Sequence, residues 1–160
     1  MRRVDRQVTD IEQICEVIDR CKVLRLGIFT QDAPYIVPMN FGWERLGGAF
    51  VFYMHCAREG RKIDLLQKNA RVGFEMDGAH ALVDAQTACQ MSYRYESIIG
   101  TGRIEFVEDA LEKVHALEKI VLHQCGRRVK VDAAPEGVTV LLLRAESLEC
   151  KRNARQGGLL

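Results

Sequence analysis

The sequence predicts a mainly β protein of the α+β kind, in which six antiparallel strands form a barrel-like sheet with a few flanking helices. Three observations predict this class. Segments rich in β-forming residues recur along the chain, helical periodicity occurs only near the start, in the middle and toward the end, and the turn "RLGG" (45–48) joins two strand-like segments as an antiparallel hairpin does. Because long helices do not alternate regularly with the strands, a parallel doubly wound sheet is disfavoured.

The N-terminal segment predicts an amphipathic helix. Thr9, with Glu12 three residues later, forms a capping box, which satisfies backbone donors at the start of a helix. Apolar residues then recur at helical spacing as far as Cys21. We therefore expect a helix within residues 9–22.

Three strands follow in the first half of the chain. Turn residues at 31–34 separate "VLRLGIFT" (23–30) from "YIVPMNFGWE" (35–44), and "RLGG" then leads into "AFVFYMHC" (49–56). Pro38 is unusual inside a strand, because proline has no N–H to donate to a ladder. It therefore marks an edge, a bulge or a gap that faces a ligand.

The second half predicts two helices and three strands. Asp109 is a suitable N-cap for the later helix, and Gly100 and Gly102 predict kinks in a long strand. The expected elements are a helix at about 60–68, a strand at 71–78 with a short extension at 80–83, a bent strand at 91–109, a helix at 110–125 and a final strand at 137–150.

Length and composition indicate one domain. The chain has 160 residues, of which 48% are hydrophobic, so it can bury a core of ordinary size. We expect the domain to span residues 1–150 and residues 151–160 to form a flexible C-terminal tail. The absence of a recognisable signal peptide, an apolar run no longer than "VTVLLL" and six cysteines without a CxxC motif predict a cytoplasmic protein with reduced thiols and no membrane span.

The charge balance gives no reason to expect a nucleic-acid partner. Basic and acidic side chains number 23 and 22, which leaves a net charge of +1. Short basic clusters occur at 2–6, 126–130 and 151–155. They are far apart in the sequence and mixed with acids, so we interpret them as solvated surface.

A loop at the start of the middle helix carries three cations around one glycine. In "AREGRK" (57–62), a helix that begins near Gly60 exposes unpaired N–H groups and the positive end of its dipole. Glycine lets a ligand approach the main chain, and arginine matches phosphate oxygens. These features predict a phosphate site. A solvated loop, in which Glu59 balances the charge, is an equally supported alternative at this stage.

Histidines and cysteines offer weaker candidates. His55 ends an apolar strand, where a histidine satisfied by backbone groups is more common than a ligand. Cys56 is more often a small buried apolar side chain than a nucleophile. His115 and His123 lie eight residues apart on one helix, and we expect both on its solvated side. No His/Cys pair has zinc-finger spacing, so no metal site is predicted.

Three ordered motifs carry a resemblance to a known family. They are "YIVPMNFGWE" (35–44), "FYMHCAREGRKIDLLQKNARVGFEMD" (52–77) and "SYRYESIIGTGRIEFVED" (92–109). With them the chain resembles the pyridoxamine 5′-phosphate oxidase-related flavoproteins, and more narrowly their nitroimidazole-resistance (Nim) branch. The resemblance covers about residues 1–150. It implies a split β-barrel and a homodimer that holds flavin mononucleotide (FMN) in a cleft between subunits.

The resemblance also implies roles for individual residues. The strand at 37–40 would lie along the isoalloxazine ring, Arg61 and Lys62 would hold the phosphate, and His55 would lie beside the flavin as the catalytic candidate. Ser97 would reach the cleft from the second subunit. The predicted cofactor-binding residues are Val37, Pro38, Met39, Asn40, His55, Cys56, Gly60, Arg61, Lys62 and Ser97.

The function implied is a flavin-dependent oxidoreductase that reduces a small nitroaromatic or quinone-like substrate. The oxidase's C-terminal substrate-binding segment has no counterpart here, which argues against pyridoxamine phosphate as substrate, and glycine replaces a common serine at position 60. The alternatives are a non-catalytic flavin-binding protein and a haem-binding protein with His55 as axial ligand. FAD or a deazaflavin could replace FMN.

Overall fold

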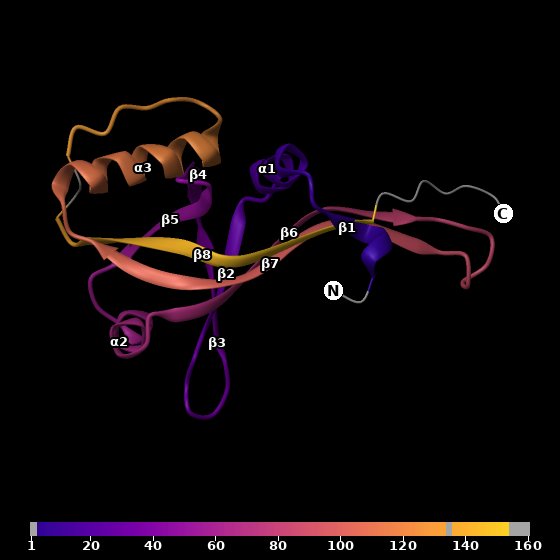
Figure 1. Ribbon diagram of the computed structural model, residues 1–160, viewed down its shortest axis with the longest axis horizontal. Coiled ribbons are helices and arrows are strands. Elements are labelled where there is room, and N and C mark those ends of the chain that lie inside the picture. The colour runs from indigo at the N-terminus through magenta and orange to yellow at the C-terminus, as the bar shows by residue number, and fades with distance from the viewer. Residues whose placement is uncertain (1–2, 134–135, 154–160) are drawn as a thin grey trace.

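Figure 1 shows the computed structural model of the chain, which describes residues 3–133 and 136–153. In chain order the elements are the 3-10 turn η1 (Val4–Arg6), strand β1 (Gln7–Val8), helix α1 (Ile11–Arg20), strands β2 (Val23–Ile28), β3 (Tyr35–Asn40), β4 (Gly42–Leu46) and β5 (Ala49–Ala57), helix α2 (Arg61–Lys68), strands β6 (Arg71–Val83) and β7 (Ser92–Val107), helix α3 (Ala110–Cys125) and strand β8 (Val138–Asn153).

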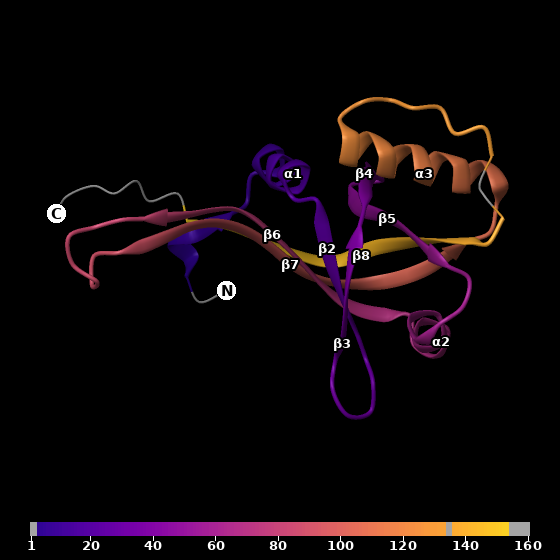
Figure 2. The same cartoon turned by 180° about the vertical axis from the view of Figure 1, so that it is seen from behind.

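One antiparallel sheet makes the body of the protein. Its strand order is β3-β2-β6-β7-β8-β5-β4, with β1 added beside β8. Strands β6, β7 and β8 run through almost the whole length of the molecule, with α1 and α3 on one side and α2 and the β2–β3 hairpin on the other (Figures 1 and 2). This arrangement confirms the predicted mainly β, antiparallel split-barrel class, with eight strands instead of six.

The two additional strands have local causes. The predicted strand 35–44 is interrupted at Phe41, where the chain leaves its pairing with β2 and begins to pair with β5. Glycine is needed at position 42 because α3 packs closely against it there: a Cβ would lie 2.3 Å from the backbone carbon of Lys119 in α3. The second additional strand is β1, which pairs only with the end of β8.

The two ends of the described chain correct the sequence prediction. The N-cap of α1 is Asp10 and not the predicted Thr9. The Asp10 carboxylate accepts a 2.9 Å hydrogen bond from the backbone N–H of Gln13. Strand β8 continues to Asn153, so residues 151–153 belong to the sheet and not to a tail, because β1 and β7 both pair with them. The remainder of the predicted tail, 154–160, lies outside the described residues.

Apolar side chains form two core clusters. The larger cluster lies inside the barrel and includes Phe41, Phe52 and Leu141, and the smaller one lies between the sheet and α3. His123 of α3 was expected on the solvated side and is instead buried. Its Nε2 lies 2.8 Å from the Cys21 carbonyl oxygen and its ring packs against Phe41, whereas His115 is exposed as expected.

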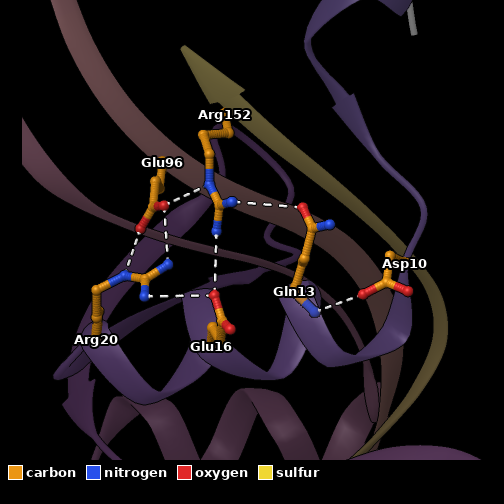
Figure 3. A network of polar contacts seen from close by, with 6 residues as sticks. All are labelled: Asp10, Gln13, Glu16, Arg20, Glu96 and Arg152. Atoms are coloured by element: carbon orange, nitrogen blue, oxygen red, sulfur yellow. Dashed lines mark hydrogen bonds and ion pairs between the residues drawn. The ribbon is translucent and has the colours of Figure 1, made fainter. Parts of the chain in front are cut away.

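A charged network attaches α1 to the sheet (Figure 3). The Glu96 carboxylate, on β7, is only 7% exposed and accepts hydrogen bonds from Arg20 of α1 at 2.7 and 2.9 Å and from Arg152 of β8 at 2.6 Å. Glu16 lies 3.8 Å from each of the same two arginines. The network therefore joins the helix to two strands through one nearly buried carboxylate.

Three further properties concern only residues 3–133 and 136–153. No helix there is long and apolar enough to cross a membrane. No group of three or more His, Cys, Asp or Glu side chains could hold a metal ion. All six cysteines are free thiols.

Candidate functional site

The sheet opens between β3 and β5. Strand β5 pairs with β4 only as far as Tyr53, which lies opposite Gly42. Beyond that point, residues 55–57 pair with β8 alone, while β3 pairs with β2 and leaves its other edge free among the described strands. Pro38 lies in this edge strand. Of the three positions predicted for it, an edge, a bulge or a gap that faces a ligand, the structure shows the edge.

Helix α2 begins at this opening. Gly60 is its N-cap and has a φ of +124°, a conformation that favours glycine. No side chain caps this end, so the first amide groups of the helix remain available to a ligand. A Cβ at Gly60 would meet nothing within 4 Å, so the main chain here is open to approach.

Two cations at the start of α2 contact the edge strand. The Arg61 guanidinium lies 4.6 Å from the centroid of the Tyr35 ring, and the Lys62 ammonium lies 3.1 Å from the Met39 sulfur. Within the described parts of the chain, Arg58, Arg61 and Lys62 have no carboxylate within 4.0 Å. Three positive charges at the positive end of a helix therefore lack an anionic partner.

His55 and Cys56 are adjacent in sequence but lie on opposite faces of β5. Phe52 and Met54 point into the barrel core, and Cys56 packs against the same core. His55 alternates with it, is exposed and lies opposite Val140 on the face that α3 covers farther along the strand. The sequence placed both residues in one site, and the fold gives them different surroundings.

Cys56 remains a protonated thiol at neutral pH. Burial raises the pKa of its thiol, and this effect outweighs the opposing influence of the nearby Lys62 ammonium. A raised pKa removes the thiolate that a nucleophile needs. Cys56 therefore contributes packing next to Lys62, as its residue type suggested.

The edge strand presents alternating side chains. Val37 and Met39 face the core opposite Leu26 and Leu24, while Pro38 and Asn40 lie on the other face. The Asn40 amide already donates to the Lys22 carbonyl at 3.2 Å and to the Gln124 side chain at 3.0 Å. Its carbonyl oxygen is then the part of the side chain left for a ligand.

Ser97 lies far from the start of α2 within one chain. It occupies β7 between Asp77 of β6 and Lys151 of β8. Strand β6 begins at Arg71, just after α2, and the six-residue separation from Arg71 to Asp77 corresponds to about 20 Å of strand. The contribution of Ser97 from a second subunit stays a prediction, and a single chain does not bring it to Arg61.

Sequence reasoning missed Tyr35 as part of this region. Its ring supports the Arg61 guanidinium, although 26 positions separate the two residues. Nothing local in the sequence marks this contact, because it depends on how β3 lies beside α2. An aromatic residue directly before the "IVPMN" motif was the only available signal.

Comparison with known proteins places these features in a family. Residues 10–152 match the protein family described as pyridoxamine 5′-phosphate oxidase. A candidate 5-nitroimidazole antibiotic resistance protein from Bacteroides thetaiotaomicron is 32% identical, with 91% of this chain and 86% of that chain covered and a TM-score of 0.77. A search of curated proteins gave no significant match.

More distant structures share the fold. The flavocytochrome Anf3 from Azotobacter vinelandii is 21% identical, and the alignment covers 98% of this chain and 73% of that chain with a TM-score of 0.76. A FAD and haem binding protein from Mycobacterium smegmatis is 17% identical, and the alignment covers 97% of this chain and 77% of that chain with a TM-score of 0.77. At these identities the likeness concerns the fold alone.

Proposed function

Because this chain belongs to the pyridoxamine 5′-phosphate oxidase family, over residues 10–152, we propose that it binds FMN and reduces a small nitroaromatic or quinone-like molecule. The single observation that carries the proposal is the unpaired charge at the start of α2. Arg61 and Lys62 lie at an uncapped helix N-terminus beside an open glycine. A phosphate monoester supplies the negative charge and the acceptor oxygens that this arrangement lacks.

The phosphate would be held by main chain and side chain together. The free amides at the start of α2 would donate to its oxygens, and Arg61 would add a planar pair of donors. The Tyr35 ring packs against the guanidinium and favours its position at this end of the helix. Glycine at position 60 supplies close access in place of a serine hydroxyl, so the affinity depends more strongly on the two cations.

The flavin ring would lie along the free edge of β3. Pro38 has no N–H, so this edge presents one donor fewer to a flat ligand that takes the place of a neighbouring strand. Bound flavin supplies the capacity to take up and pass on electrons. The chain's own part is to orient the ring, to exclude water from it and, at His55, to hold a proton that a reduced substrate can accept.

A homodimer would complete the cleft. The outer face of the sheet carries exposed Ile36 and Ile99, which are 55% and 52% accessible, on the same face as Gly27 and Gly73. Apolar residues exposed on an extended sheet face are suited to a protein interface. In such a dimer Ser97 would approach the cleft of the partner subunit. Six free thiols agree with the proposed cytoplasmic location.

The substrate class rests on the relative from Bacteroides thetaiotaomicron, which is described as a candidate 5-nitroimidazole resistance protein and is 32% identical. A nitro group accepts electrons and protons, which is the chemistry that a flavin beside a histidine can provide. Pyridoxamine phosphate is not the proposed substrate.

The visible spectrum of the purified protein, followed by titration with FMN, tests the cofactor. We expect flavin absorbance or stoichiometric FMN binding. A Soret band would favour haem, and no binding of FMN would refute the proposal. Reoxidation of the anaerobically reduced, flavin-loaded protein by a nitroaromatic tests the activity, because the reduced flavin supplies the electrons that the nitro group accepts. Stoichiometric flavin without turnover of nitro compounds or quinones would indicate a non-catalytic flavin-binding protein.

A further inference from the structure

Two basic clusters that are far apart in the sequence meet in the fold. Strand β1 pairs with the end of β8, so that Gln7 lies opposite Lys151. This pairing brings Arg6, from the cluster at 2–6, close to Lys151, from the cluster at 151–155. The clusters are far apart in the sequence and were predicted to be solvated surface; the fold brings these two half-buried residues together.

Tyr95 of β7 lies between the two cations. The Arg6 Nη1 donates to the Tyr95 hydroxyl at 3.0 Å, and the Arg6 guanidinium lies 5.9 Å from the ring centroid. The Lys151 ammonium is also 5.9 Å from that centroid. All three side chains are half-buried. They come from three separate segments and meet around the Tyr95 side chain.

Among the described residues, this cluster contains more hydrogen-bond donors than acceptors, because the Tyr95 oxygen is the one acceptor within it. The Arg6 Nε is buried and has no hydrogen-bond partner. With its oxygen accepting from Arg6, the Tyr95 hydroxyl still has its own proton to donate. Among the described residues, no carboxylate lies within 4.0 Å of Arg6 or Lys151.

Most carboxylates of this region are already engaged, and Glu149, which lies two residues before Lys151 on the same face of β8, is exposed and not within 4.0 Å of a cation among the described residues. Asp5 pairs with Arg3, and Asp77 pairs with Arg25 and His80. Glu96 lies on the opposite face of β7, where Arg20 and Arg152 hold it. Leaving buried donors without an acceptor costs free energy, so an acceptor from outside the chain would stabilise the cluster.

The phenol responds to its surroundings. Burial by itself would raise the pKa of Tyr95, but hydrogen bonds from Arg6 and Lys151 outweigh it and lower the pKa below its ordinary value. The positive environment therefore already favours negative charge at this position.

Apolar surface flanks the donors on the same face of β7. Tyr93, two residues before Tyr95, is 49% exposed. The Tyr93 ring lies 5.9 Å from the His80 ring. A flat apolar ligand body could pack on these side chains while its charged end meets the cations.

We infer that Arg6, Tyr95 and Lys151 bind the carboxylate of a small aromatic acid. Arg6 and the Tyr95 hydroxyl supply directed donors, Lys151 supplies charge, and Tyr93 supplies aromatic surface. One consequence rests on the proposed function. Ser97 lies between Tyr95 and Ile99 on β7, so in the proposed dimer the cluster would border the partner's flavin. There it would select nitroaromatic or quinone substrates that carry a carboxylate.

Titration of the full-length protein with benzoate tests the site directly, by calorimetry and by the ultraviolet absorbance of tyrosinate. We expect benzoate to bind and to raise the pH at which Tyr95 ionises. The double variant Arg6→Gln/Lys151→Gln should bind benzoate about tenfold or more weakly, since two charge-assisted contacts are lost. Tyr95→Phe should weaken binding and remove the change in tyrosinate absorbance.

Controls separate the site from general charge effects. Arg128→Gln, an exposed cation in the loop after α3, should leave the affinity unchanged. Benzyl alcohol should bind far more weakly than benzoate. Equal affinity of the two ligands, no binding of benzoate, or equal binding by wild type and a folded double variant would overturn the inference. Binding of inorganic phosphate without benzoate would overturn the aromatic-acid assignment.

A second measurement separates this inference from the flavin proposal. Benzoate binding is measured without added FMN, so a protein that never takes up flavin can still support the carboxylate site. In protein whose bound flavin has first been reduced anaerobically, 4-nitrobenzoate should reoxidise the flavin with a higher second-order rate constant than nitrobenzene, and the double variant should remove that preference. Benzoate binding without any preference would refute the link to substrate choice.

Discussion

The arginines around Glu96 and the cations at the start of α2 carry similar charge, but only the arginines pair with carboxylates of the chain. Arg20 and Arg152 both donate to the Glu96 carboxylate, which is 7% exposed, and Glu16 adds a second negative charge nearby (Figure 3). Among the described residues, Arg61 contacts an aromatic ring, Lys62 contacts sulfur-containing side chains, and neither has a carboxylate within 4.0 Å. The first set is fully compensated within the chain, and the second is not.

This difference distinguishes a structural role from a binding role. A buried carboxylate with two guanidinium partners holds α1 on the sheet, and each of its groups is satisfied. Cations collected at a helix N-terminus without an anion raise the electrostatic energy of the folded protein, unless a ligand provides the missing charge. Pairing within the chain, and not the number of cations, is therefore the useful criterion here.

The largest expected effect is on the compensated network. Glu96→Gln should lower the free energy of unfolding by about 2–3 kcal/mol, because two arginines lose their shared carboxylate. Their partial exposure, 44% for Arg20 and 24% for Arg152, keeps the loss below that of a fully buried pair. Urea unfolding of both proteins measures this difference.

A surface pair provides the matched control. Arg71 and Glu146 lie 3.3 Å apart, with side chains 63% and 44% exposed, so Glu146→Gln should change the free energy of unfolding by no more than about 0.5 kcal/mol. If the two variants were equally stable, the Glu96 network would not be the attachment of α1 to the sheet.

The next effect concerns the uncompensated cations. Arg61→Ala should weaken FMN binding by about 1.5–3 kcal/mol, roughly 10- to 150-fold, as expected for a lost charge-assisted hydrogen bond. The flavin-free protein should lose less than about 1 kcal/mol of stability, from the contact with Tyr35 alone. Fluorescence titration with FMN and urea unfolding provide the two values.

Lys68→Ala, at the other end of the same helix, is the control for Arg61→Ala. Lys68 is exposed and is the last residue of α2, so its removal should leave FMN affinity unchanged. An Arg61→Ala protein with wild-type affinity would contradict the phosphate site, whatever the flavin content of the protein.

The smallest expected effect on stability concerns Glu44, another carboxylate whose charge is paired within the chain, and it depends on acid pH. Glu44 accepts from Tyr53 and His115 at 2.7 Å each and pairs with Lys119 at 2.6 Å. Burial alone would raise the pKa of Glu44, but the bonds from Lys119, His115 and Tyr53 hold it at about 2, below its ordinary 4.5. Because the folded pKa is the lower one, this stabilisation is present above pH 4.5 and is lost as the pH falls toward 2.

Urea unfolding at several pH values measures the Glu44 contribution. Glu44→Gln should cost about 1–2 kcal/mol at pH 7, since His115 is half-exposed and its contribution is screened. The gap between variant and wild type should then narrow as the pH falls from 4.5 toward 2. A gap that stays constant over this range would show that the Glu44 carboxylate is not linked to folding.

Much of the fold could be predicted because its signals are local. The N-cap at Asp109, the α2 boundaries and the edge position of Pro38 were all confirmed, since each depends on the conformational preference of one residue or its near neighbours. The N-cap of α1 is Asp10 and not Thr9. Both residue types can cap a helix, and the residue at which the backbone becomes helical determines which one does. His123 was misplaced, because burial of a helix face depends on what packs against it.

The candidate site divides in the same way. Gly60, Arg61 and Lys62 are adjacent in sequence, so their position at a helix start could be predicted. Their contacts with Tyr35 and Met39 could not, because those contacts join segments more than twenty residues apart. The opposite faces of His55 and Cys56 follow from strand alternation once the core side of β5 is known.

The sequence by itself determined the mainly β antiparallel class, the two helix starts at Gly60 and Asp109, and the accumulation of cations at one of them, because these properties follow from short-range periodicity, capping and charge. Only the tertiary structure decided which charges find partners. Arg20 and Arg152 meet Glu96, whereas Arg6 and Lys151 meet each other around Tyr95. Pairing depends on distances between side chains, and only the packing of α1, β1, β7 and β8 brings those side chains together.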